Sequence, residues 1–163
     1  MLNPYNLEDH PDGDKKFVCD NGREYLIYYI DTTQSCDGIK VFSIGFDLLN
    51  KVRVSGSDER VSHTICFYFD ALIAEHDCIL VYTPSSEMNR SREARTKLFD
   101  DWNNNLNQYF RCGKLTTERI ELSYPTDEGE IEIITPTVFY KEGQASDARR
   151  FVDEIIPKFI YKS

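Results

Sequence analysis

The amino-acid sequence predicts an α+β domain with a mostly antiparallel sheet, and three observations lead to this fold class. Short runs of alternating apolar and polar residues near both ends of the chain are typical of strands. A continuous apolar run over 78–82 is typical of a strand covered on both faces. Two longer segments, 58–76 and 89–110, carry apolar residues at helical spacing. The predicted order is β-β-β-α-β-α-β-β-α, with the helices packed on the sheet.

Three strands are predicted before the first helix. Residues 16–19 and 24–30 flank Asp20-Asn21-Gly22, a sequence that favours a tight hairpin turn. Residues 39–48 alternate between apolar and polar positions and complete an antiparallel meander. Residues 1–14 are polar and rich in Pro, Asp and Gly, so we expect a loosely held lead-in to a single domain over 15–163.

The segment 58–76 is predicted to be the first helix. Apolar residues recur there at helical spacing, and Ser57 can cap the helix. Residues 61–65 also alternate as a strand would, so the pattern alone leaves open whether the whole segment is helical. The length through His76 favours a helix.

The rest of the chain is predicted to be a strand, a helix, two strands and a helix. After the strand at 78–82, Asn89 is a suitable cap for a helix with an apolar stripe ending near Phe110. Residues 116–124 and 131–140 are expected to pair across a hairpin loop at 126–129, with Pro136 marking an edge or a bulge. Residues 145–161 form the last predicted helix, which Pro157 is expected to kink or shorten.

The bulk composition limits the classes of function and location. The chain has 163 residues, a formal net charge of −9 and a pI near 4.8, so nucleic acid and anionic lipid are unfavourable partners. No segment approaches the roughly 20 apolar residues of a membrane span. Five cysteines without paired spacing, and an N-terminus that does not look like a signal peptide, predict free thiols and a cytoplasmic location.

One stretch offers a candidate anion-binding site. Residues 88–119 hold seven Lys or Arg against four Asp or Glu, although the chain as a whole is acidic. A loop between a strand and a helix presents free backbone N–H groups and the positive end of a helix dipole. Arginine adds forked donors that suit phosphate or carboxylate. The candidate residues for such a site are Ser85, Ser86, Arg90, Arg92 and Arg95. The alternative is a solvated helix face.

Two other clusters are weaker candidates. His63 and Cys66 would share one face of a helix and could form a nucleophilic pair, but a core cysteine beside a marginal histidine explains them as well. The acids at 127–132 could hold a hard cation, but a solvated hairpin tip accounts for them equally. We therefore assign no catalytic residue, no metal ligand and no cofactor from the sequence.

The motifs resemble those of a family of small, functionally uncharacterised bacterial proteins, mainly from Bacteroidetes. The resemblance covers residues 3–102. It lies in Asn3-Pro4-Tyr5, the turn region 17–25, the run 79–82 and the arginine-rich segment closing on LFDDW at 98–102. The family has no established activity, so it implies no catalytic residues.

The order of elements is also similar to the core of the GNAT acyltransferases. In that family a Gly-rich turn before the first of the core helices holds the pyrophosphate of acetyl-CoA. The matching turn here, residues 54–60 (VSGSDER), has one Gly and two acids, which would repel a pyrophosphate.

These observations favour a non-catalytic binding or regulatory protein, of the immunity, antitoxin or accessory kind. Its partner would be another protein or a phosphorylated small molecule, and a homo-oligomer is compatible with the sequence. The alternative is a GNAT-like transferase or an enzyme acting on a phosphorylated small molecule.

Overall fold

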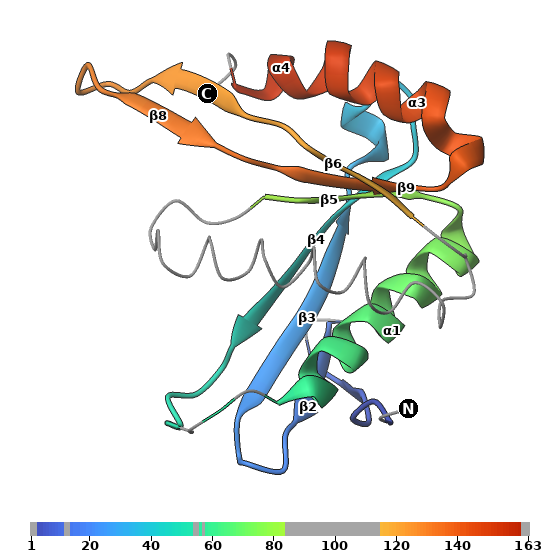
Figure 1. Ribbon diagram of the computed structural model, residues 1–163, viewed down its shortest axis with the longest axis vertical. Coiled ribbons are helices and arrows are strands. Elements are labelled where there is room, and N and C mark those ends of the chain that lie inside the picture. Colours follow the sequence, from blue (N-terminus) through green and yellow to red (C-terminus); the bar gives the residue numbers. More distant parts are fainter. Residues whose placement is uncertain (1–2, 12–13, 54–55, 57, 84–114, 161–163) are drawn as a thin grey trace.

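A seven-stranded mixed sheet organises the chain (Figure 1). The structure, a computed structural model, describes residues 3–11, 14–53, 56, 58–83 and 115–160. In spatial order the strands are β1 (Glu8–Asp9), β2 (Lys15–Val18), β3 (Glu24–Asp31), β4 (Val41–Leu48), β5 (Ile79–Tyr82), β9 (Thr137–Tyr140) and β6 (Thr116–Arg119). The α+β class with a mostly antiparallel sheet is therefore confirmed, with β4 and β5 as the parallel pair among the described strands.

The meander β2–β3–β4 forms as expected from its turn. Between β2 and β3, Gly22 has a φ of 91°, a left-handed conformation that glycine adopts without strain. The turn is closed by backbone bonds from Gly22 to the carbonyl of Cys19 and from Cys19 to that of Arg23. The strands then pair antiparallel in register, with Phe17 opposite Tyr25 and Ile27 opposite Phe46.

The helix α1 (Glu59–His76) carries the chain from β4 to its parallel neighbour β5. The prediction of a helix over this segment is confirmed along its whole length. The capping residue is Asp58 and not Ser57 as expected; the Asp58 side chain accepts a bond from the backbone N–H of Arg60. The helix ends at Asp77, which has a left-handed φ of 50° and donates its N–H to the carbonyl of Ile73. An aspartate tolerates this conformation better than most residues do.

The strands β6 to β9 form one long, bent hairpin. The strand expected at 116–124 is divided into β6 and β7 (Leu122–Pro125), and the strand expected at 131–140 into β8 (Ile131–Ile134) and β9. At the bend the N–H of Ile120 donates to the carbonyl of Pro136. Pro136, expected to mark an edge or a bulge, lies in the break between β8 and β9. We call residues 122–134, the distal half of the hairpin, the arm; its two strands pair outside the main sheet (Figure 1).

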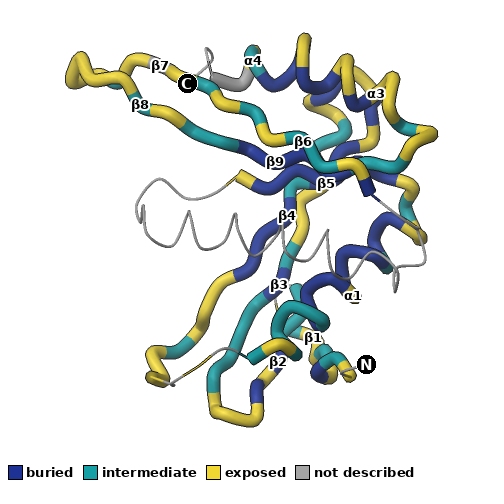
Figure 2. The backbone as a smooth tube through the Cα atoms, viewed as in Figure 1, coloured by how far each residue is buried: buried dark blue, intermediate teal, exposed yellow. Residues whose placement is uncertain are grey.

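Apolar residues fill both faces of the central strands. Most residues of β5 and β9 are accordingly buried (Figure 2). On β5, Leu80 and Tyr82 belong to the core beneath α1, whereas Ile79 and Val81 belong to the core beneath the C-terminal helical segment. Because side chains alternate along a strand, these two helical elements lie on opposite faces of the sheet. This explains why the run at 78–82 is apolar throughout.

The C-terminal helical segment contains a π-helical turn. It comprises α3 (Ala145–Arg150), the π turn Phe151–Ile155 and α4 (Ile156–Ile160). The N–H of Ile156 donates to the carbonyl of Phe151, five residues earlier. Proline lacks an N–H and crowds the carbonyl of the preceding turn, so a widened turn directly before Pro157 lets the helix continue past it. The expected distortion at Pro157 thus takes the form of a π turn.

The segment expected as a loosely held lead-in is attached to the domain in its described part. Tyr5 is only 7% exposed and packs in the core under α1. Glu8 and Asp9 form β1, which pairs with Lys15 and Lys16 of β2. The polar composition hid this attachment because only a few apolar residues of the segment, among them Tyr5 and Leu7, pack against the core. The second helix predicted over 89–110 lies outside the described residues.

Candidate functional site

The predicted anion site lies outside the described residues: Ser85, Ser86, Arg90, Arg92 and Arg95 all fall within 84–114. The structure does place the strand that leads to it. β5 ends at Tyr82, at the carboxyl end of the parallel pair with β4. In open sheets with parallel strands, ligands commonly bind outside the carboxyl ends of those strands. The position of the loop in the chain is therefore compatible with a ligand site.

The described residues at this end of β5 combine an aromatic pair with two buried hydroxyls, those of Tyr82 and Thr137. Tyr82 stacks on Phe46, with ring centroids 6.3 Å apart. Thr137 of β9 lies opposite Tyr82 on one side and Arg119 of β6 on the other. Thr137 is 1% exposed, and within the described parts of the chain its Oγ1 has no hydrogen-bond partner. This hydroxyl is a feature that a polar ligand at this place could use.

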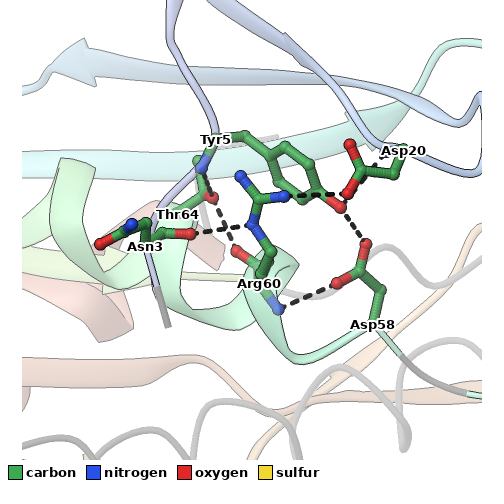
Figure 3. Close-up of polar contacts among 6 residues, drawn as sticks. All are labelled: Asn3, Tyr5, Asp20, Asp58, Arg60 and Thr64. Atoms are coloured by element: carbon green, nitrogen blue, oxygen red, sulfur yellow. Dashed lines mark hydrogen bonds and ion pairs between the residues drawn. The ribbon is translucent and has the colours of Figure 1, made fainter. Parts of the chain in front are cut away.

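A polar cluster joins the N-terminal segment to the start of α1 (Figure 3). The hydroxyl of Tyr5 donates to Oδ2 of Asp58 at 2.5 Å, while Oδ1 of Asp58 accepts from the N–H of Arg60 at 3.0 Å. The hydroxyl of Tyr5 also accepts a bond from the N–H of Asp20 at 3.3 Å. The N–H of Tyr5 donates to Oγ1 of Thr64 at 2.8 Å. The backbone N–H and the hydroxyl of Tyr5 are thus both hydrogen-bonded within the protein.

Arg60 completes this cluster. Its guanidinium lies over the ring of Tyr5, with Cζ 3.8 Å from the ring centroid. Its Nε donates to the carbonyl of Asn3 at 2.9 Å, and its Nη1 pairs with Asp20 at 3.0 Å. Arg60 therefore holds the backbone of the N-terminal segment, the turn after β2 and the Tyr5 ring together. The guanidinium therefore binds groups of the protein itself, which is typical of a structural role.

The electrostatics of the cluster oppose acid–base or nucleophilic work near neutral pH. Burial, followed by the hydrogen bond to Asp58, raises the pKa of Tyr5 to about 12. Burial, followed by the charges of Asp58 and Asp20, raises the pKa of Cys19 to about 11. A general base or nucleophile is effective when its pKa lies near the working pH. Both groups stay protonated instead, which suits a structural joint.

The His63–Cys66 candidate does not have the properties of a nucleophilic pair. Cys66 is buried in the core under α1. Burial and the charge of Asp70 raise the pKa of its thiol well above the usual value, whereas a catalytic thiol needs a lowered one. Cys19, Cys36 and Cys78 are likewise buried and free of disulfides. Cys112 lies outside the described residues.

The acidic residues at the hairpin tip do not form a metal site among the described residues. Among the residues with described placement, no three His, Cys, Asp or Glu side chains gather closely enough to hold a metal ion. Asp127, Glu128 and Glu130 are instead exposed around the turn of the arm. That turn is closed by bonds from Thr126 to the carbonyl of Glu130 and from Gly129 to that of Thr126.

Exposed apolar residues lie on one face of the arm. Ile131 is 75% exposed and Ile133 is 44% exposed, and side-chain alternation places both on the same face of β8. Their cross-strand partners, Pro125 and Ser123, are exposed as well. The opposite face contains Leu122, which packs against the core under the C-terminal helical segment. One face of the arm is thus tied to the domain, and the other presents isoleucine to solvent.

A second apolar area lies on the back of the meander, on the face opposite α1. Ile30 is 59% exposed, and Val18 and Leu49 are exposed too. Leu26 and Tyr28 lie between them and are half-buried. We call these five residues the uncovered face, because the core beneath the C-terminal helical segment includes Val41 of β4 but none of them. Lys16 and Glu24 form an ion pair within this face at 3.5 Å.

Comparison with known proteins adds no assignment. No protein-family model matches the chain, and no match was found among curated proteins or solved structures. None of the described helices is long and apolar enough to cross a membrane. The function must therefore be argued from the residues of this chain.

The sequence pattern missed the polar cluster at the start of α1. Asp58 could have been recognised as a cap, because an aspartate directly before a helical repeat is a common cap. The partnership of Tyr5 with residues more than fifty positions away had no local signal. The exposure of Ile131 and Ile133 was hidden for a similar reason, since alternation shows which residues share a face but not whether that face is covered.

Proposed function

We propose that this protein is a non-catalytic binding protein whose partner is another protein of net positive charge. An immunity, antitoxin or accessory role is of this kind. The observation that carries the proposal is the uncovered face, where Val18, Ile30 and Leu49 are exposed on a sheet surface. Several apolar residues exposed on one face of a folded domain commonly mark a surface for another macromolecule.

The charge of the chain indicates the character of the partner. The net charge is −9, which favours association with cationic proteins and disfavours nucleic acid and anionic lipid. The described ionisable groups also point away from catalysis: Arg60, Asp58 and Asp20 are engaged with one another and with the N-terminal segment. A binding role needs none of them to be poised for proton transfer.

The proposal is tested with the protein as bait in an extract of its source cell. The wild type is compared with a Val18→Thr, Ile30→Thr variant, which removes apolar surface and keeps β-branched residues in the strands. Phe67→Ser, which changes an exposed apolar residue on α1, is the matched control. We expect at least one basic protein to be enriched by the wild type and by the control. The purified pair should then bind at least tenfold more weakly with the uncovered-face variant.

Equal enrichment by all three baits, or an enriched set without basic proteins, would contradict the proposal. Circular dichroism and melting of each variant show whether a lost interaction reflects the surface or a loss of folding.

The alternative is an enzyme, either a GNAT-like transferase or one acting on a phosphorylated small molecule. The buried Thr137 hydroxyl near the end of β5 favours a polar ligand at that place. Against an acyl-CoA ligand, the carboxylate of Asp58 occupies the N–H of Arg60 at the start of α1 and would repel a pyrophosphate. Acetyl-CoA is therefore expected not to bind in the low micromolar range by calorimetry.

The anion site is tested by the variant Arg90→Gln, Arg92→Gln, Arg95→Gln. A ligand that binds the folded state raises the melting temperature by mass action. If the site exists, inorganic phosphate or a nucleotide stabilises the wild type, salt weakens the shift, and the triple variant lacks it. Identical shifts for the two proteins would assign these arginines to a solvated helix face.

A further inference from the structure

We propose that the arm, residues 122–134, is a docking element that receives an apolar segment flanked by Lys or Arg from the protein partner. The inference rests on the proposed function and adds a second contact with the partner, separate from the uncovered face. The arm is distinct from the uncovered face, which consists of residues of β2 and β3 and of Leu49 directly after β4, so the two surfaces can be varied independently.

Exposure of isoleucine in a two-stranded ribbon is the first observation. Two antiparallel strands alone are marginally stable in water, and a ribbon usually gains stability by packing a face on another element. The arm does so with Leu122, while Ile131 is 75% exposed on the other face. Pro125 beside it is exposed as well, so the apolar surface spans both strands. A partner could cover this face without displacing anything from the core.

The charge of the arm is the second observation. Between residues 120 and 135 the chain has no Lys, Arg or His, and its charged residues are Glu121, Asp127, Glu128, Glu130 and Glu132. A second copy of the arm would bring like charges together, which is a common protection of exposed strands against self-association. The complementary occupant is therefore a cationic segment, and its basic residues would lie toward the acidic tip.

The geometry of the tip keeps the acids next to the apolar face. Gly129 has a φ of 81°, and the turn is closed on itself by the Thr126–Glu130 and Gly129–Thr126 backbone bonds. The hydroxyl of Thr126 also accepts from the N–H of Glu130 at 3.3 Å. Asp127, Glu128 and Glu130 are thus attached to a formed turn directly before Ile131. A partner segment lying along Ile131 and Ile133 meets these carboxylates at one end.

The test uses synthetic peptides as probes. A fluorescent dodecamer of six Lys followed by six Val carries its basic residues at one end of an apolar segment, as the proposed occupant does. Its controls are a dodecamer of six Glu followed by six Val and a peptide with Lys and Val alternating, which places the two kinds of residue on opposite faces when extended. Binding is measured by fluorescence anisotropy at low and high salt. The protein variants are Ile131→Thr, Ile133→Thr for the apolar face and Asp127→Asn, Glu128→Gln, Glu130→Gln for the acids.

We expect the peptide with Lys before Val to bind the wild type at least tenfold more tightly than either control peptide. Each arm variant should weaken that binding at least tenfold, and high salt should weaken it for the wild type. Threonine retains the β-branched shape, so the ribbon persists, and unchanged circular dichroism and melting verify this. The Val18→Thr, Ile30→Thr variant of the uncovered face should bind the peptide as the wild type does.

Two results would overturn the inference, and they are distinguishable. Equal affinity for wild type and arm variants, with loss in the uncovered-face variant, would remove the arm as the docking element and leave the proposed function standing. Equal affinity for the Lys–Val and Glu–Val peptides would remove the charge preference from both proposals.

Discussion

Replacing Tyr5 with Phe isolates the contribution of one hydroxyl to the attachment of the N-terminal segment. The change keeps the ring, its stacking on Phe17 with centroids 5.8 Å apart and the guanidinium of Arg60 above it. It removes the donor to Asp58, at 2.5 Å, and the weak acceptor for the N–H of Asp20, at 3.3 Å. The effect on stability is therefore that of the polar contacts alone.

The expected loss follows from the chemistry of that bond. A hydrogen bond to a charged group contributes about 1.5–3 kcal/mol to folding. Asp58 is only partly buried, so water can solvate its carboxylate after the hydroxyl is removed. We therefore expect the free energy of unfolding to fall by about 1.5 kcal/mol, toward the lower end of this range. Tyr5→Ala also removes the ring from the core and should cost about 3–5 kcal/mol.

Urea denaturation at neutral pH measures both losses, and Tyr29→Phe is the matched control. Tyr29 also stacks on a phenylalanine, Phe42, at 4.8 Å, but its ring is more exposed. Its conversion should change the free energy of unfolding by less than about 0.5 kcal/mol. A Tyr5→Phe loss as small as that of the control would refute the structural role assigned to the Tyr5–Asp58 bond.

The pH dependence offers an independent check of the environment of this hydroxyl, since burial, followed by the hydrogen bond to Asp58, raises its pKa. The pKa of Tyr5 is raised from 10.0 to about 12, so the folded state favours the protonated hydroxyl. The resulting stability is fully present below pH 10 and is lost as the pH rises toward 12. The stability difference between wild type and Tyr5→Phe should therefore shrink over this interval. A difference that stays constant up to pH 12 would contradict the raised pKa.

Three further predictions concern the backbone and the thiols. Gly45→Ala should destabilise the sheet by about 1–3 kcal/mol in urea denaturation, because an added Cβ would lie 2.5 Å from the ring of Tyr28 on the neighbouring strand. Adding Tyr28→Ser should relieve most of that loss. If the two changes destabilise the double variant additively, the contact is contradicted. Asp77→Ala should lower the free energy of unfolding by about 1 kcal/mol in the same assay. Asp77→Gly should lower it less, since the left-handed φ of 50° at this position favours glycine over alanine. A larger loss for glycine than for alanine would contradict this explanation. The buried thiols should react with iodoacetamide at pH 8 at least tenfold more slowly in the folded protein than in urea, because burial raises the pKa of each of them: Cys19, Cys36, Cys66 and Cys78. Peptide mass spectrometry measures the labelling of each cysteine. Fast labelling of any of these four in the folded protein would contradict the prediction.

Local signals were sufficient for much of the sheet. The glycine turn at 20–22 predicted the first hairpin because it leaves few conformations other than a reversal. The apolar run at 78–82 predicted a strand covered on both faces, and the two cores above and below β5 explain it. Pro136 predicted the interruption between β8 and β9, because a proline cannot donate to the ladder.

The sequence could not predict contacts that depend on distant partners. The polar residues of 1–14 concealed Tyr5, whose burial depends on Phe17 and α1 rather than on its neighbours in the chain. β1 consists of two residues, too few for alternation to be recognised. The candidate anion site, Ser85 to Arg95, remains a prediction because it lies outside the described residues. The arm was expected as a hairpin, but the exposure of its isoleucines follows only from where its strands leave the main sheet.

The position of β5 between β4 and β9 also has a consequence for the order of folding. The meander and α1 pair segments that are close in sequence, so their contacts close short loops. The pairing of Leu80 with Phe139 closes a much longer loop, and the entropy of closure rises with its length. We expect β2 to α1 to form first and to hold β5 in place as a template, on which β9, β6 and the C-terminal helical segment assemble last. Substitutions in the first half should then slow folding, whereas those in the second half should mainly accelerate unfolding.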